Sequence, residues 1–330
     1  MNYMRIIFKK FKARMIVGCI LAVIALLAVS VIVFINQASF GRTPRGERLE
    51  RVMKSPNYRN GEFKNQHETL LMTSDRGRFS GIWEFIFRKI DGLRPEQAVK
   101  AIKTDLRKIG RNEEILVWFG HSSYLIQTGG KRILVDPVFC MASPVSFVNK
   151  PFKGTELYTP DDMPDIDYLV ISHDHWDHLD YNTVKKLKDR IGAVICPLGV
   201  GEHFEYWGFD KERLIELDWN EDANLAPGFM IHCLPARHFS GRRLTANQSL
   251  WASFLLEAPS QKIYIGGDGG YDTHYAEIGN RFPGIDLAIL ENGQYNEEWS
   301  LIHLMPQYMA QTARDLKAKR VLTVHHSKYA

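Results

Sequence analysis

Residues 171–180 read Ile171-Ser172-His173-Asp174-His175-Trp176-Asp177-His178-Leu179-Asp180, a stretch of the form HxHxDH. The apolar run at 168–172 leads directly into it and is predicted to be a strand. His173 and His175 are two residues apart, so in extended backbone both side chains point to the same face. They can therefore bind one ion from the end of that strand. A charged, solvated loop is the alternative, and the apolar strand that precedes the motif argues against it.

The chain then turns toward a predicted helix that begins at Tyr181, and this turn carries Asp177 and His178 to a second position. Imidazole and carboxylate ligands in one loop suit zinc, with manganese and iron as alternatives. The stretch thus predicts one or two divalent metal ions.

One loop cannot supply all the ligands of two ions, so further ligands are expected at other strand ends. Three residues follow apolar, strand-like runs in this way: His238, Asp268 and His325. Taken alone, each could equally be a cap or a surface group. The glycines around Asp268 form neither a GxGxxG fingerprint nor a Walker loop, which argues against a phosphate-binding loop there.

The N-terminal region differs from the rest of the chain. Residues 1–14 contain five basic residues and no acid, and residues 15–35 form an uninterrupted apolar run. At about 1.5 Å per residue this run reaches roughly 30 Å, enough to cross a bilayer. A cleaved signal peptide is the alternative, but its apolar core is shorter and a small-x-small cleavage site is expected. We therefore predict a basic cytoplasmic flank at 1–14 and a single-pass anchor at 15–35, with the remaining chain outside the cytoplasm.

Charge and cysteine content exclude two classes of protein. The formal net charge of the 330 residues is +4, and removing the five basic residues of the N-terminal flank leaves −1. A nucleic-acid-binding surface is therefore not expected. The four cysteines include no CxxC pair and do not indicate a disulfide scaffold.

Beyond about residue 110, short apolar runs alternate with Gly, Pro and Asp breaks. We predict strands at 115–119, 124–127, 132–135, 168–172, 193–196, 230–234, 249–256, 262–266, 286–290 and 320–324. We predict helices at 181–190, near 199–206, at 273–281 and at 306–317. The mixture of closely spaced strands and strand–helix alternation indicates an α/β domain, residues 111–330, with sheets covered by helices. Residues 36–110 are predicted to be a linker and a mostly helical lead-in.

These residues resemble the metallo-β-lactamase fold superfamily, in which an HxHxDH loop is followed by a histidine, an aspartate after a strand, and a final histidine. The resemblance is closest to the branch of N-acyl-phosphatidylethanolamine-hydrolysing phospholipase D and the RomA-like bacterial hydrolases. It implies an αββα sandwich with metal ions at one rim. Besides HxHxDH, it is carried by WFGHSS at 118–123, DPVF at 136–139, PLGVG at 197–201, PARHFSG at 235–241, LWAS at 250–253 and GDGGY at 267–271.

The resemblance also implies roles for individual side chains. It assigns one ion to His173, His175 and His238, the other ion to Asp177, His178 and His325, a bridging position to Asp268, a place near the substrate phosphate to His303, and the edge of the site to His121. His326 has no counterpart and is expected to be a neighbour only. Two departures are visible: Gly replaces the usual Thr after Asp268, and only five residues follow His325. The domain is therefore expected to be short at its C-terminus, with a loosely held last strand end.

The expected chemistry is metal-dependent hydrolysis. Two neighbouring ions would lower the pKa of a shared water to about 7, and the hydroxide would attack a phosphorus or carbonyl centre. Together with the anchor, the resemblance predicts a membrane-bound phosphodiesterase acting on a phospholipid, with Asp177, Asp268 and His303 catalytic and with His303 and His121 touching substrate. Two alternatives stay open: a small-molecule lactonase or ester hydrolase on the same fold, and a non-catalytic metal-binding membrane protein.

Overall fold

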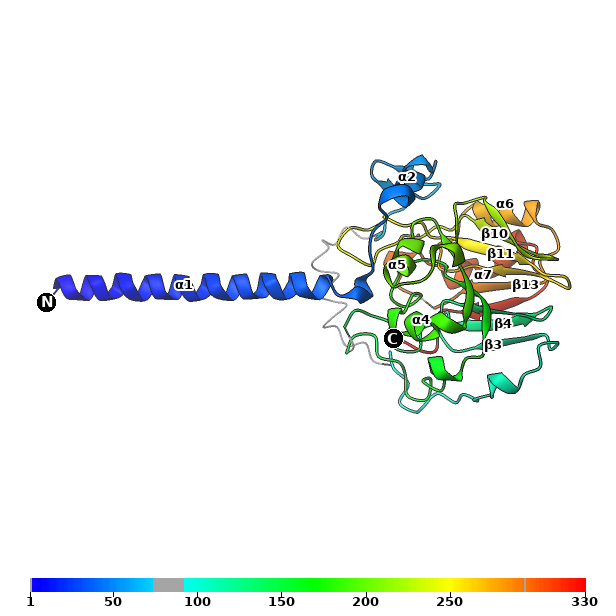
Figure 1. Cartoon of the computed structure of the whole chain (residues 1–330), viewed down its shortest axis with the longest axis horizontal. Helices are drawn as coiled ribbons and strands as arrows, with labels where there is room; N and C mark the ends of the chain where they lie inside the picture. The colour runs from blue at the N-terminus through cyan, green and yellow to red at the C-terminus, as the bar shows by residue number, and fades with distance from the viewer. Residues whose placement is uncertain (1, 74–91, 146, 294) are drawn as a thin grey trace. The chain divides into compact units, whose positions relative to one another are not determined.

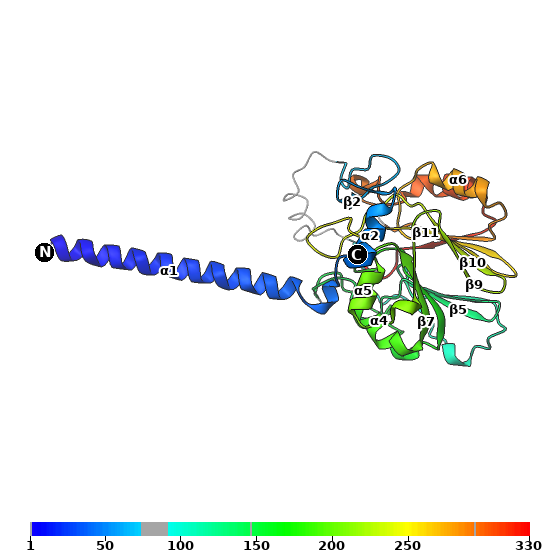
Figure 2. The same cartoon turned by 45° about the horizontal axis from the view of Figure 1, so that its top comes forward.

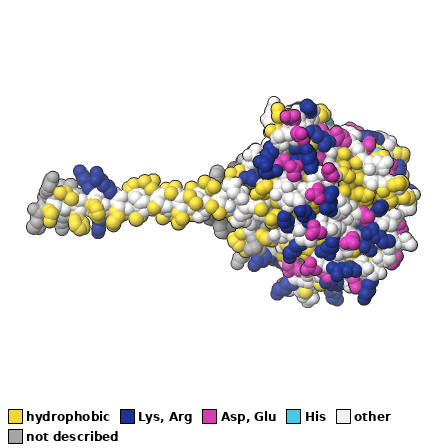
Figure 3. All heavy atoms as spheres, viewed as in Figure 1, with side chains coloured by type: hydrophobic (Ala, Val, Ile, Leu, Met, Phe, Trp, Pro, Cys, Tyr) yellow, Lys and Arg dark blue, Asp and Glu magenta, His cyan; other side chains and the backbone are white. Residues whose placement is uncertain are grey.

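The computed structural model describes residues 2–73, 92–145, 147–293 and 295–330, in two units, Met1–Phe40 and Gly41–Ala330. The N-terminal unit is the helix α1 (Asn2–Ile35) followed by the short 3-10 helix η1 (Ala38–Phe40) (Figure 1). The segment Lys10–Ile35 is long and apolar enough to cross a membrane by length and composition. Its large apolar side chains are exposed along the helix, as the yellow surface in Figure 3 shows. The segment predicted as an anchor, 15–35, lies within this candidate span.

The beginning of the second unit corresponds to the predicted lead-in at 36–110, of which residues 74–91 lie outside the described residues. The described part contains the helix α2 (Gly46–Lys54), the paired strands β1 (Tyr58–Arg59) and β2 (Glu62–Phe63), and the 3-10 helix η2 (Leu106–Lys108). Val52, Phe63 and Leu106 are fully buried in the cores of the larger domain. The lead-in therefore packs on the domain.

One six-stranded sheet has the order β3-β4-β5-β6-β7-β8. Its strands are β3 (Ile115–Trp118), β4 (Tyr124–Thr128), β5 (Lys131–Val135), β6 (Ile166–Val170), β7 (Ile191–Pro197) and β8 (Leu214–Leu217). The strands β3 to β5 pair antiparallel, and β5 to β8 pair parallel. The turn between β4 and β5 is Gly129-Gly130, and both glycines have positive φ, as a two-residue hairpin of this kind requires.

The other six-stranded sheet has the order β14-β13-β12-β11-β10-β9. Its strands are β9 (Asp222–Ala226), β10 (Phe229–Leu234), β11 (Ser253–Glu257), β12 (Lys262–Ile265), β13 (Leu287–Glu291) and β14 (Val321–Val324). The strands β9 to β12 pair antiparallel, and β12 to β14 pair parallel. The ends of β10, β12, β13 and β14 consequently meet at one edge.

Alternation along the strands builds three cores. On β4, Tyr124 and Ile126 face the other sheet, where they pack with Ile231, Phe254 and their neighbours, whereas Leu125 faces outward. The outer face of the first sheet is covered by α4 (Tyr181–Leu187) and α5 (Gly201–Tyr206), and that of the second by α6 (His274–Arg281) and α7 (Met309–Asp315). Figure 2 shows these layers. The predicted αββα sandwich is confirmed.

Three secondary-structure predictions need correction. The strands β8 and β9 were not predicted, because Glu216 interrupts the apolar run of β8 and because β9 is a polar edge strand. The strand predicted at 249–256 begins only at Ser253. Residues before it bond to loops of the first sheet instead: the Leu250 N–H donates to the Leu198 carbonyl and the Ala252 N–H to the Ser172 carbonyl.

Candidate metal centre

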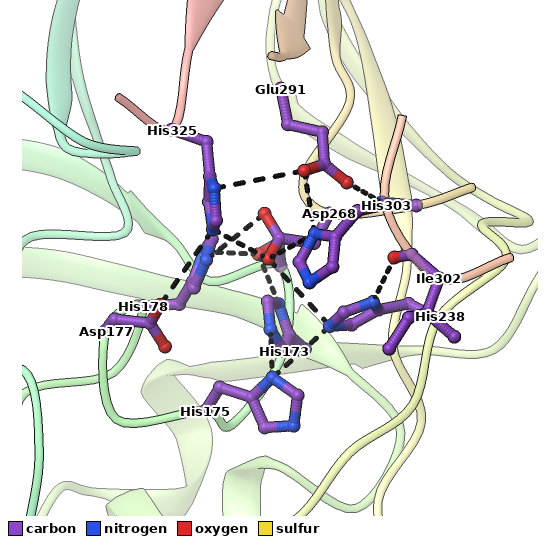
Figure 4. A network of polar contacts seen from close by, with 12 residues as sticks. His173, His175, Asp177, His178, His238, Asp268, Glu291, Ile302, His303 and His325 are labelled. Atoms are coloured by element: carbon purple, nitrogen blue, oxygen red, sulfur yellow. Dashed lines mark hydrogen bonds and ion pairs between the residues drawn. The ribbon is translucent and has the colours of Figure 1, made fainter. Parts of the chain in front are cut away.

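The HxHxDH loop leaves the carboxyl end of β6 and is fixed at both of its ends. Below it lies the buried Asp136, which accepts hydrogen bonds from the Ser172 N–H at 2.8 Å and from the Ser172 hydroxyl at 2.6 Å. Beyond it, Asp180 caps α4 by accepting from the Asn182 N–H at 3.1 Å. The loop is thus held in one conformation, with its histidines turned toward the other sheet (Figure 4).

The first group of candidate ligands consists of His173, His175 and His238. Nε2 of His173 lies 2.9 Å from Nδ1 of His175, which lies 3.3 Å from Nε2 of His238. The Nδ1–H of His238 donates to the Ile302 carbonyl at 2.7 Å, so its Nε2 lone pair faces the group. Burial lowers the pKa of His173 and His238 well below the usual range. Both rings are therefore neutral, and each has a ring-nitrogen lone pair that can bind a cation.

The second group contains His121, Asp177, His178 and His325, whose donor atoms all lie within 4.8 Å of one another. Nε2 of His121 is 3.1 Å from Oδ2 of Asp177, and Nε2 of His325 is 3.9 Å from the same oxygen. The Nδ1–H of His178 donates to Oδ2 of Asp136 at 2.8 Å, which leaves Nε2 of His178 for the site. Burial lowers the pKa of His121 to about 3. His121, expected at the edge, thus lies within this group.

Asp268 lies between the two groups. Its Oδ1 is 3.2 Å from Nε2 of His178, and its Oδ2 is 3.0 Å from Nε2 of His325 and 3.8 Å from Nε2 of His238. Burial would raise the pKa of Asp268, but the charges of His178 and His325 hold it well below the usual range. Burial would in turn lower the pKa of His325, but the charge of Asp268 outweighs this and raises it to about 9. A carboxylate in this position can touch both groups.

The centre of the site holds buried polar atoms that have no hydrogen-bond partner among the residues that the structure describes. They are Nε2 of His178, Oδ1 of Asp268 and both ring nitrogens of His325. His178 and Asp268 approach each other closely, yet these atoms are not aligned for a hydrogen bond. Buried groups of this kind are normally satisfied, and a cation among them would satisfy Nε2 of His178, Oδ1 of Asp268 and one ring nitrogen of His325. The nitrogen and oxygen donors therefore fit divalent metal binding.

A second buried carboxylate, Glu291 at the end of β13, was not predicted. Its Oε2 accepts from the Nδ1–H of His303 at 2.8 Å, and its Oε1 accepts from the backbone N–H of Gly269 at 2.7 Å and of Leu304 at 3.2 Å. The same Oε2 is 3.9 Å from Nδ1 of His325. Glu291 thus orients His303 beside the group formed by Asp268 and His325.

Asp136 belongs to the DPVF stretch of the family resemblance, but its support of His178 was also not predicted. The sequence carried a usable signal for both carboxylates. Asp136 directly follows β5 and Glu291 ends β13, just as Asp268 and His325 follow their strands. An acid at the end of a buried strand, next to strands that end in ligands, was the pattern to look for.

The end of the chain is more firmly held than expected. The His325 N–H donates to the His121 carbonyl at 2.9 Å, and the His121 N–H donates to the His326 carbonyl at 3.0 Å. His325 and Lys328 are buried, and the Phe152 N–H donates to the Lys328 carbonyl at 2.7 Å. The expectation of a loosely held strand end is therefore wrong. The loop between β3 and β4 and the loop between β5 and β6 both hydrogen-bond to this segment.

Comparison with known families places a beta-lactamase superfamily domain at residues 131–326. This range covers more than half of the chain and includes every predicted metal ligand. The predicted resemblance to this superfamily is confirmed.

Individual relatives agree with this match. An uncharacterised protein of Mycobacterium tuberculosis (strain ATCC 25618 / H37Rv) is 38% identical over 260 residues, which is 77% of this chain and 68% of that protein. The N-acyl-phosphatidylethanolamine-hydrolyzing phospholipase D 1 of Caenorhabditis elegans is 29% identical over 229 residues, 64% of this chain and 63% of the relative. Among solved structures, CmlA, a diiron beta-hydroxylase from Streptomyces venezuelae, matches with a TM-score of 0.50 at 20% identity, covering 64% of this chain and 45% of that one. The last match supports the fold only.

Proposed function

The chain belongs to the beta-lactamase superfamily and is a metal-dependent hydrolase of that fold, and from this premise we propose that it is a two-metal phosphodiesterase acting on a phospholipid. The observation that carries the proposal is the convergence of His173, His175 and His238 on one side of Asp268, and of Asp177, His178 and His325 on the other. We propose these seven residues as the ligands. Zinc suits the nitrogen-rich donor set best, with manganese and iron as alternatives.

The lipid part of the proposal has two supports. The name of the C. elegans relative states that it hydrolyses N-acyl phosphatidylethanolamine, although the match spans less than two thirds of that protein. The candidate span Lys10–Ile35 would keep the domain at a bilayer. We propose a basic cytoplasmic flank at 1–14, an anchor at 15–35, a lead-in at 36–110 and a catalytic domain at 111–330 outside the cytoplasm. The order of charges around the span favours this orientation.

A pair of bound divalent ions would supply an activated water and a Lewis acid for the scissile oxygen. The chain's own residues would supply position and proton control. Asp177, held by His121 at 3.1 Å, can orient the attacking water. His303 donates its Nδ1–H to Glu291, which leaves Nε2 for the substrate, and once protonated this nitrogen can donate a hydrogen bond to a phosphoryl oxygen. Asp268 would hold the two halves of the site at a fixed separation.

The test is to incubate purified, metal-analysed full-length protein with N-acyl phosphatidylethanolamine and to measure phosphatidic acid. We expect phosphatidic acid and N-acylethanolamine in equal amounts, and no product with Asp268→Ala. Parallel reactions with a lactone and with a soluble phosphodiester separate the alternatives. Turnover of the lactone with no phosphatidic acid would refute the phosphodiesterase and favour the lactonase.

A further inference from the structure

A pocket beside the second ligand group is not used by the reaction proposed above. It opens between the loop after β5 and the segment after β14. The apolar part of its wall is formed by Val138, Phe139, Met141, Ala142, Val148 and Pro151, and the polar part includes Ser143, Asn149, Lys150 and Glu156. Two side chains from the other sheet's half of the chain complete it, Lys328 and Tyr329.

Lys328 is a built part of this pocket. Only 4% of the residue is exposed, and its aliphatic stem packs against Gly120. A Cβ added to Gly120 would lie only 3.3 Å from this stem. Gly120 has positive φ, so a side chain there is disfavoured twice. The Lys328 ammonium donates one hydrogen bond, to the Val138 carbonyl at 2.8 Å.

The ammonium has spare binding capacity. It carries three N–H groups, and among the described residues the Val138 carbonyl is its one hydrogen-bond acceptor. The rings of Phe139 and Tyr329 lie further away, with centroids 5.8 and 5.7 Å from Nζ. Burial lowers the pKa of Lys328 to about 8, so near neutral pH the group is still charged. A buried cation without a paired anion is costly, and an anionic group entering the pocket would offset that cost.

The pocket adjoins the ligand groups through Tyr329. The ring of Tyr329 packs edge-on against His121 with centroids 5.0 Å apart, and His121 contacts Asp177. A molecule that fills the pocket therefore ends next to the second ligand group. The exposed Cys140 lies on the pocket wall, so the reactivity of its thiol can be used to measure whether the pocket is occupied.

We propose that this pocket is a subsite for an amphiphilic anion, in which Lys328 binds a phosphate or carboxylate oxygen and the apolar wall holds the attached alkyl chain. Its role as a substrate subsite rests on the proposed function, but the binding itself does not. Glu156 lies exposed on the rim and is the first acid in the charge environment of Lys328. Its negative charge should weaken anion binding.

The experiment measures the rate at which N-ethylmaleimide labels Cys140 in metal-loaded full-length protein, read on the peptide that contains Cys140. The probes are octyl phosphate, octanoate, inorganic phosphate and octyltrimethylammonium. We expect both octyl anions to slow labelling, inorganic phosphate to do so only weakly, and the cationic amphiphile to have no effect. The ratio between octyl phosphate and octanoate identifies which oxyanion the site prefers.

Variants assign the effect to residues. Lys328→Met should weaken protection by octyl phosphate at least about tenfold, and Lys328→Arg should largely restore it. Glu156→Gln should strengthen protection up to about fivefold, as expected for one exposed charge. Val148→Trp should block the octyl anions and leave inorganic phosphate unchanged. Since Glu156 and Val148 are exposed, these two variants keep the test usable if Lys328→Met does not fold.

Protection by the cationic amphiphile equal to that by octyl phosphate would overturn the proposal. So would unchanged protection in Lys328→Met and Glu156→Gln. Because labelling requires no turnover, protein that binds octyl phosphate through Lys328 but cleaves no phospholipid would sustain the subsite and refute the proposed reaction. Cleavage without protection would do the opposite.

Discussion

The sheet β3–β8 and the sheet β9–β14 both contribute to the metal centre, but they do so in different ways. In the first, a single loop after β6 supplies His173, His175, Asp177 and His178, supported by Asp136 from the neighbouring strand. In the second, β10, β12, β13 and β14 each supply one side chain: His238, Asp268, Glu291 and His325. The first half is local in sequence, whereas the second exists only after its strands have paired.

The most severe way to break this arrangement is to remove the residue that both halves touch. We expect Asp268→Ala to abolish hydrolysis and to reduce bound metal from about two ions per chain to one or fewer, because a bridging carboxylate serves both ions. Far-ultraviolet circular dichroism should stay unchanged. His326→Ala is the matched control, since the His326 side chain hydrogen-bonds with Thr323 and Ser327 and its backbone carbonyl is unchanged by the substitution. Full activity in Asp268→Ala would contradict the two-metal assignment.

Single-ligand variants sharpen the comparison. His238→Ala should empty the position shared with His173 and His175, and His325→Ala should empty the position shared with Asp177 and His178. Elemental analysis should then give about one ion per chain in each variant, because the loss of one protein ligand weakens the binding of that ion. Retention of both ions in either variant would show that the two groups are not separate sites.

The two supporting carboxylates offer a milder test. Asp136→Asn should weaken metal binding by about 10–100-fold, because Asp136 fixes the tautomer of His178. Glu291→Gln should instead lower kcat with metal content unchanged, because its closest side-chain partner is His303. Titration with a metal-buffered chelator and steady-state kinetics separate the two effects. If Glu291→Gln loses metal as Asp136→Asn does, Glu291 supports His325 rather than His303.

The smallest expected effect concerns Lys328, which reaches from the second half to the first. Burial lowers its pKa from 10.5 to about 8, with Glu156, Asp180 and Cys140 as the nearby acidic groups. Between these two values the unfolded chain binds a proton that the folded chain does not, so the free energy of unfolding should rise with pH. Urea denaturation from below pH 8 to above pH 10.5 measures this rise. Lys328→Met should remove it, and an equal slope in both proteins would count against the lowered pKa.

The difference between the two halves also explains which residues of the site could be predicted from the sequence. The HxHxDH spacing needs only local backbone geometry, so the loop and the strand before it could be predicted from residues 168–180 alone. His238, Asp268 and His325 were found because each follows an apolar run, but their grouping came from the family resemblance. Glu291 was not predicted as a site residue, because an acid that ends a strand looks like a cap until the neighbouring strands are known. The burial of Lys328 was not predicted, because nothing in the sequence around it distinguishes a buried lysine from a solvated one.

The grouping of His178 with His325 has a consequence for folding. His178 and His325 belong to one ligand group, yet about 150 residues separate them, so their meeting is a long-range contact that small local structures cannot nucleate. An ion held by both would close that loop and act as a reversible cross-link on the folded state. It would add stability that grows with the logarithm of the ratio of its concentration to its dissociation constant, because the unfolded chain lacks the site. Chelation should therefore reduce the resistance of the whole domain to unfolding as well as its activity.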